Sequence, residues 1–144
     1  MADGLTGAER VNGGNGATRK SGFQDLIAWQ KAMILVTAIY RATGDWPREE
    51  LYGLTSQVRR AAVSIPSNLA EGHGRTGSRE FAHHVSIAYG SLCELETQVL
   101  IAKQLGYAST DTSERLTAQM MEVRRLIRGL LRSLRGSTDT EADR

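Results

Sequence analysis

Arginines dominate the segment 112–135, which holds six of them and only two acidic residues. The candidate nucleic-acid contacts among them are Arg124, Arg125, Arg128, Arg132 and Arg135. The last four are spaced three, four and three residues apart, so a helix would gather them into one stripe. Guanidinium groups in such a stripe can neutralise the phosphates of RNA or DNA. A solvated face near a helix C-terminus explains the same pattern, and no aromatic residues are interleaved to stack bases.

Two further arginines, Arg59 and Arg60, lie side by side in the middle of another helical segment. One interpretation gives them ion pairs to glutamates on other helices or other subunits, which would fix the helix register. The available partners are Glu71, Glu94 and Glu96. The other interpretation makes both arginines contacts to nucleic acid, and we keep them as candidates for that role.

The remaining reactive residue types form no recognisable catalytic or metal site. Glu80 and His83 have the Glu-x-x-His spacing of di-iron bundles, but such a site needs a second copy of the motif. The glycines of segment 72–77 spell G-x-G-x-x-G, yet no strand precedes them, so a helix cap and turn are expected. The single cysteine, Cys93, can form no internal disulfide. We therefore expect a protein that is not an enzyme and holds no cofactor or metal.

Four segments carry apolar residues at helical spacing, and these segments would have to position the arginines. The expected helices cover 25–43, 51–71, 78–105 and 112–135. Heptad-spaced seams joined by short loops predict an all-α protein, an antiparallel up-down-up-down four-helix bundle with left-handed packing. Pro66 lies inside the second segment, so we expect a kink there, with a break into two short helices as the alternative.

The heptad seams also identify the residues expected to face the core. They are Leu26, Trp29, Met33, Val36 and Tyr40 in the first segment; Leu54, Val58, Ala61 or Ala62, Ile65 and Leu69 in the second; Phe81, Val85, Ala88, Leu92, Leu95, Val99 and Ala102 in the third; and Leu116, Met120, Val123, Ile127, Leu130 and Leu134 in the fourth.

Large apolar residues also occur beside these seams, where one bundle alone would leave them in water. They are Ile27, Ile34, Ile87, Leu100, Ile101, Met121, Leu126 and Leu131. A monomer would then expose more contiguous apolar surface than is usual. These eight residues are therefore candidates for an interface between copies of the chain.

The two ends of the chain lack helical apolar spacing. Segments 1–22, which is rich in glycine, and 136–144, which is polar, are expected to be disordered tails around a bundle at 23–135. No stretch of 18 apolar residues is present and no apolar run follows a basic start, so neither a membrane span nor a secretory signal is expected. These features predict a cytoplasmic protein.

Several stretches of the sequence are unusual enough to compare with a known family. FQDLIAWQKA at 23–32, YGLTSQVRRAAVSIPSNLAEG at 52–72 and GSLCELETQVLIAKQLGY at 90–107 form an ordered series. This series resembles the bacterial four-helix-bundle family encoded in intervening sequences of 23S rRNA genes. The fourth helix resembles it only by pattern, and His73 stands where an aromatic residue is more usual.

The resemblance implies a four-helix bundle that assembles into a homopentamer, five bundles packed into a barrel-like ring. It implies no known activity. In fold the family is similar to the accessory protein of diversity-generating retroelements, which binds nucleic acid and a reverse transcriptase, although a shared fold supports a shared function only weakly.

Two functions remain open on the sequence alone. The first is a non-enzymatic oligomeric bundle that binds RNA or DNA through arginine-rich surfaces. The alternative is a protein–protein interaction scaffold with no role in nucleic-acid binding. Salt distinguishes them, because phosphate contacts weaken steeply as salt rises and apolar interfaces do not.

Overall fold

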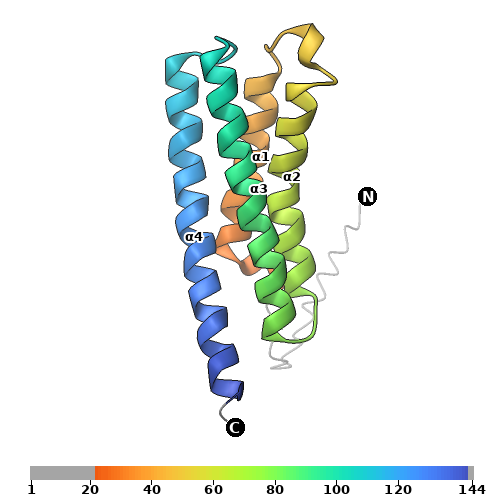
Figure 1. Cartoon of the computed structure of the whole chain (residues 1–144), viewed down its shortest axis with the longest axis vertical. Coiled ribbons are helices and arrows are strands. Elements are labelled where there is room, and N and C mark those ends of the chain that lie inside the picture. The colour runs from red at the N-terminus through yellow and green to blue at the C-terminus, as the bar shows by residue number, and fades with distance from the viewer. Residues whose placement is uncertain (1–21, 143–144) are drawn as a thin grey trace, which may run out of the picture.

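The computed structural model describes residues 22–142, and side-chain surroundings as far as residue 136. Its elements in chain order are η1 Phe23–Asp25, α1 Ile27–Thr43, η2 Arg48–Glu50, α2 Leu54–His73, α3 Ser78–Gln104 and α4 Thr110–Ala142. Each α-helix runs antiparallel to the one before it (Figure 1). The prediction of an all-α four-helix bundle is therefore confirmed.

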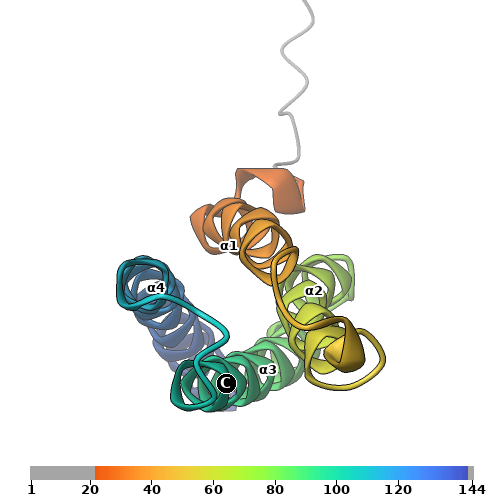
Figure 2. The same cartoon turned by 90° about the horizontal axis from the view of Figure 1, so that it is seen from above.

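The four helices stand at the corners of a rough square when viewed from one end (Figure 2). Each helix packs against the helices next to it in the chain, and α4 closes the square by packing against α1. Apolar residues from all four helices meet in one buried cluster along the centre. None of the described helices is both long enough and apolar enough to span a membrane.

The predicted seam of α3 is confirmed almost residue for residue. Val85, Ala88, Leu92, Leu95, Val99 and Ala102 are all buried, and Phe81 packs against the core from its edge. The seam of α4 is likewise buried through Ile127, and Leu130 and Leu134 pack partly buried beside it. These two helices show that a faultless heptad pattern fixes which face of a helix enters the core.

The predicted seam of α1 is confirmed only in part. Trp29 and Val36 pack partly buried against the core, whereas Met33 and Tyr40 are 43% and 45% exposed. The buried residues of α1 are instead Ala28, Ala32, Leu35, Ile39 and Thr43. The helix carries two apolar stripes with the same spacing, so periodicity alone could not choose between them. The buried stripe contains two alanines, and these small side chains let α1 approach its neighbours closely.

Helix α2 is continuous through Pro66, so the alternative of two short helices is wrong. Pro66 itself is buried. Two residues on, the Asn68 Nδ2 donates to the carbonyl of Ser64 at 2.8 Å and to its hydroxyl at 3.0 Å. The hydroxyls of Ser64 and Ser91 lie 2.9 Å apart and link α2 to α3. A bend near Pro66 stays a prediction.

The glycines after α2 cap and turn the chain, as predicted. Gly74 is the C-cap of α2. Gly77 precedes α3 with a φ of 105°, a backbone conformation that residues with a side chain rarely adopt. Gly72 lies where the two helices touch, since a Cβ there would come within 2.5 Å of the His84 Cβ. These glycines therefore shape a tight connection between two helices.

The C-terminal end of the bundle differs from the prediction. Helix α4 continues to Ala142, beyond the expected end at Arg135, so most of the segment 136–144 is helical and not a disordered tail. Once a helix is formed, each further residue adds a hydrogen bond at little cost, so a helix can continue into a polar segment. The composition of the segment did not reveal this extension. The predicted tail at 1–22, apart from Gly22, lies outside the described residues, as do positions 143 and 144.

Candidate functional site

The stripe of arginines predicted on α4 lies on the surface of the bundle. Arg125, Arg128, Arg132 and Arg135 are exposed. Within the described residues, no ion pair involves Arg125, Arg128 or Arg132. Their charges are therefore not compensated by acidic neighbours there and remain available to an anionic partner.

Arg128 has an aromatic neighbour that the sequence pattern did not reveal. Its guanidinium carbon lies over the ring of Tyr89, 5.8 Å from the ring centroid. Tyr89 belongs to α3, and spacing along one helix says nothing about which residue a neighbouring helix supplies. This cation–π contact holds the guanidinium near the surface of the α3–α4 pair.

Arg124 lies next to the stripe in the sequence but has a different environment. Its guanidinium forms an ion pair with Glu96 of α3, and the two side chains are 38% and 21% exposed. The buried Nε of Arg124 and the second carboxylate oxygen of Glu96 have no hydrogen-bond partner among the described residues. Arg124 thus joins α3 to α4, and its charge is already matched.

Arg59 is fixed against α1. Its Nε donates to the Thr43 hydroxyl at 2.9 Å, and its guanidinium carbon lies 4.6 Å from the ring centroid of Tyr40. Thr43 is itself buried and donates to the carbonyl of Ile39 at 2.8 Å. Arg60, the next residue, is exposed. The guanidinium of Arg59 is therefore held in one position at the surface.

The expected ion pairs of Arg59 and Arg60 with glutamates are not formed inside the described part of the chain. Glu71 pairs with Arg75 at 3.0 Å, and Glu96 pairs with Arg124. Glu94 accepts a hydrogen bond from Gln98 at 3.1 Å. Arg59 instead contacts Thr43 and Tyr40 of α1. Ion pairs of Arg59 and Arg60 with glutamates of another copy stay a prediction.

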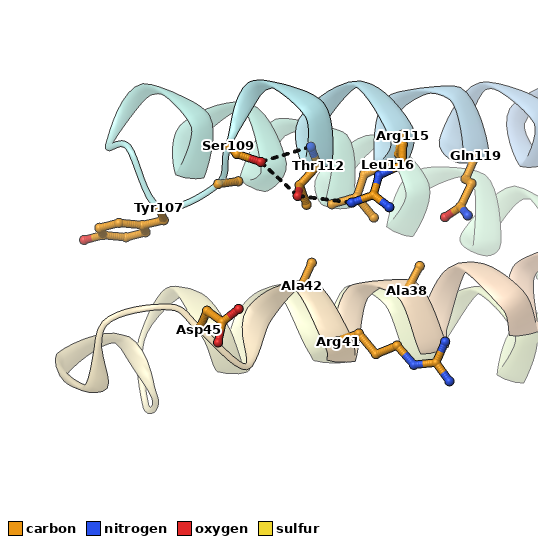
Figure 3. Close-up of a pocket in the computed structure, with 11 residues that line it drawn as sticks. Ala38, Arg41, Ala42, Asp45, Tyr107, Ser109, Thr112, Arg115, Leu116 and Gln119 are labelled. Atoms are coloured by element: carbon orange, nitrogen blue, oxygen red, sulfur yellow. Dashed lines mark hydrogen bonds between the residues drawn. The ribbon is translucent and has the colours of Figure 1, made fainter.

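A hollow at one end of the bundle lies between α1 and α4 (Figure 3). Three of its polar residues, Ser109, Thr112 and Arg115, bond to one another at the start of α4. The Ser109 hydroxyl accepts from the Thr112 backbone N–H at 3.2 Å and donates to the Thr112 hydroxyl at 3.0 Å. Arg115 donates to the same Thr112 hydroxyl at 3.5 Å. The residues that line this hollow thus bring together no nucleophile with a general base.

Glu80, His83 and His84 line one hollow together with Arg75 and Arg79. Glu80 and His83 are both exposed, and a ring nitrogen of His84 lies 3.5 Å from the Asn68 side-chain oxygen. Among the described residues, no three His, Cys, Asp or Glu side chains come together in a group that could hold a metal ion.

The candidate interface residues divide into two groups. Six of them are 40% to 62% exposed, namely Ile27, Ile34, Ile87, Leu100, Ile101 and Met121. Leu126 is half-buried against the core, and Leu131 is 9% exposed within the core itself. Leu131 follows Ile127 by four residues and so shares its buried face. We therefore remove Leu131 from the candidate interface.

Comparisons with known proteins concern the family and the fold. A family model described as 23S rRNA-intervening sequence protein matches residues 24–129. A crystal structure of a protein with unknown function from the S23 ribosomal protein family of Bacteroides thetaiotaomicron has the same fold, with a TM-score of 0.66 and 17% sequence identity. The similarity covers 73% of this chain and 98% of that one. No curated protein matches the chain significantly.

Proposed function

We propose that this chain, which belongs to the 23S rRNA-intervening sequence protein family, is a non-enzymatic bundle that assembles with copies of itself and binds nucleic acid through the arginines of α4. The exposed apolar surface supports the assembly, and the exposed arginine stripe supports the binding. The family match adds no activity to this picture.

Self-assembly rests on the large apolar side chains that the bundle leaves in water. Ile27, Ile34, Leu100 and Met121 are each more than half exposed. They occur on α1, α3 and α4, so a contact at one edge of the bundle would not cover all of them. Association with further copies would remove this surface from water, and a repeated head-to-tail contact that closes gives a ring. We propose five copies, the number that the family resemblance implies.

Nucleic-acid binding rests on the charge pattern of α4. Arg125, Arg128 and Arg132 share one exposed face, and the chain carries a net charge of only +2, so the positive charge is local. A ring would repeat this face in every copy, and each further bound phosphate releases counterions and strengthens binding. Arginines spaced along one exposed helix face can neutralise phosphates whatever the base sequence, so we propose binding without sequence specificity.

Changing these three arginines to glutamine together should weaken binding of a 30-base-pair DNA duplex. The dissociation constant should rise roughly tenfold or more at low salt, and the slope of log affinity against log salt should become shallower by about 0.9 for each phosphate that the variant no longer binds. Fluorescence anisotropy over a series of salt concentrations measures both quantities.

The matched control changes three other exposed arginines, Arg41, Arg48 and Arg79, to glutamine, with the same loss of charge. The control should keep most of the affinity. Equal losses in both triple variants would show that only net charge matters. Absence of salt-sensitive binding by the unmodified chain would favour the protein-interaction scaffold instead.

A further inference from the structure

Two adjoining hollows along α1 and α2 form one surface groove, which we call the α1/α2 groove. They share Val63. The hollow near the start of α2, called the upper hollow, is lined by Tyr40, Leu51, Tyr52, Ser56, Arg59, Arg60, Val63 and Ser64. The hollow nearer the end of α2, called the lower hollow, is lined by Trp29, Met33, Val36, Val63, Pro66, Ser67 and Ala70. The groove is thus mostly apolar with two arginines in its upper half, and none of these lining residues is acidic. Tyr52 at its upper end is 93% exposed.

The outer face of α3 carries a stripe with the opposite charge, which we call the α3 stripe. Ile87, Glu94 and Ile101 follow one another at intervals of seven residues, so they lie in line along the helix. The two isoleucines are 40% and 41% exposed, and Glu94 is also exposed. The stripe is about 21 Å long at 1.5 Å per residue. It therefore consists of two apolar anchors with one carboxylate midway between them.

We infer that the α3 stripe of one copy docks into the α1/α2 groove of the next, with Glu94 against Arg59. This inference rests on the self-assembly proposed above and names one pair of surfaces that would take part in it. The groove and the stripe are different surfaces, so each copy uses its groove toward one neighbour and its stripe toward the other. Such a head-to-tail contact forms a ring when the rotation between copies closes.

The heights of the residues along the bundle support this match. The contact between the Ser64 and Ser91 hydroxyls places these two residues at the same level on antiparallel helices. Three residues onward on α3, Glu94 is then level with Ala61 on α2, beside Arg59. A ring whose axis runs parallel to the helices keeps every residue at its height. Glu94 of one copy would therefore arrive opposite Arg59 of the next.

The apolar ends of the stripe fit by the same reasoning. Ile87 lies four residues before Ser91 and is level with the part of α2 between Pro66 and Ala70, which line the lower hollow. Ile101 lies level with the first turn of α2, next to Leu51 in the upper hollow. Charge and apolar surface thus match at three heights along the bundle.

Arg59 is well suited to receive the carboxylate. Its Nε is already engaged with Thr43 and its plane rests on Tyr40, so the terminal nitrogens are oriented before any partner arrives. Little side-chain freedom is then lost on binding. Apolar contacts on both sides would exclude water from the pair, as is typical of the centre of a protein interface.

Reversal of the charge in Glu94→Arg tests the docking. We expect the dissociation constant of self-association to rise roughly 30-fold or more for each interface, as when one partner of an interfacial charge pair is removed. Sedimentation velocity over a range of concentrations measures it, and circular dichroism confirms that the helices remain. Glu114→Arg, an equal change at an exposed position of α4, is the control and should assemble normally.

Exchange of the two charges provides the specific test. Arg59→Glu combined with Glu94→Arg should regain at least part of the assembly that Glu94→Arg alone loses. If the exchanged chain does not fold, the neutral variants Arg59→Gln, Glu94→Gln and their combination replace it. In that series the double variant should assemble no worse than either single variant, because each single change already removes the pair.

Two outcomes would overturn the docking while leaving self-assembly in place. One is normal assembly of Glu94→Arg. The other is additive losses in the neutral series, which would show that the two residues do not meet. A third outcome also overturns it: if Arg59→Gln weakens binding of a single-stranded oligonucleotide and leaves the assembled mass unchanged, the groove holds nucleic acid. If the unmodified chain does not assemble at all, the proposed function itself fails.

Discussion

Replacing Leu92 by alanine is expected to lower the free energy of unfolding by about 2–5 kcal/mol. The Leu92 side chain is completely buried in the middle of α3, within the cluster where all four helices meet. Alanine would remove apolar packing and leave a cavity that rigid helices on every side cannot fill. Chemical denaturation followed by circular dichroism at a fixed protein concentration measures the change.

Leu105→Ala is the matched control for this experiment. It removes the same atoms at the C-terminal end of α3, where Leu105 is 56% exposed. Its effect should stay within about 0.5 kcal/mol. Similar losses for Leu92→Ala and Leu105→Ala would mean that the heptad seam does not define the core of α3.

The second large effect is expected on α1, where sequence and structure disagree. Ile39→Ala should lower the free energy of unfolding by about 2–5 kcal/mol, because Ile39 is 1% exposed. The loss should be the same at all protein concentrations, since the side chain packs within one copy. Denaturation curves at several concentrations measure it.

Met33→Ala is the variant to compare with Ile39→Ala, because the sequence pattern had placed Met33 in the core. Met33 is 43% exposed and lines the α1/α2 groove. Its truncation should act mainly through association, so its effect should vary with protein concentration. A large, concentration-independent loss for Met33→Ala and a small one for Ile39→Ala would restore the original assignment of the α1 faces.

The sequence was most informative where the apolar residues of a helix follow one unbroken heptad seam. Leu92 and Leu95 of α3 and Val123 and Ile127 of α4 were placed correctly, because their neighbours at other angles are mostly polar. Helix α1 is apolar on two faces, and a repeat of three and four residues fits both equally. Choosing between the faces requires knowing which partner helix each one meets, and this depends on packing of the whole bundle.

The candidate site shows the same limit. The spacing of Arg125, Arg128 and Arg132 predicted one exposed stripe, because the spacing of residues along a helix determines which of them share a face. The pairing of Arg124 with Glu96 depends on how α3 and α4 meet, and spacing along one helix does not contain this information. The same applies to Arg59, whose contacts with Thr43 and Tyr40 join residues of two helices.

The central claim is that the exposed apolar residues of the bundle are covered by further copies of the chain. It explains why Ile27, Ile34 and Met121 are left in water by an otherwise well-buried core. It also supplies the repetition that makes three arginines on α4 an effective surface for phosphates.

The most direct test is the mass of the native particle at micromolar concentration, measured by light scattering coupled to size-exclusion chromatography. The proposed ring predicts a mass of five chains of 15.7 kDa each. The mass of one 15.7 kDa chain would contradict the claim and would remove the basis for the docking of Glu94 against Arg59.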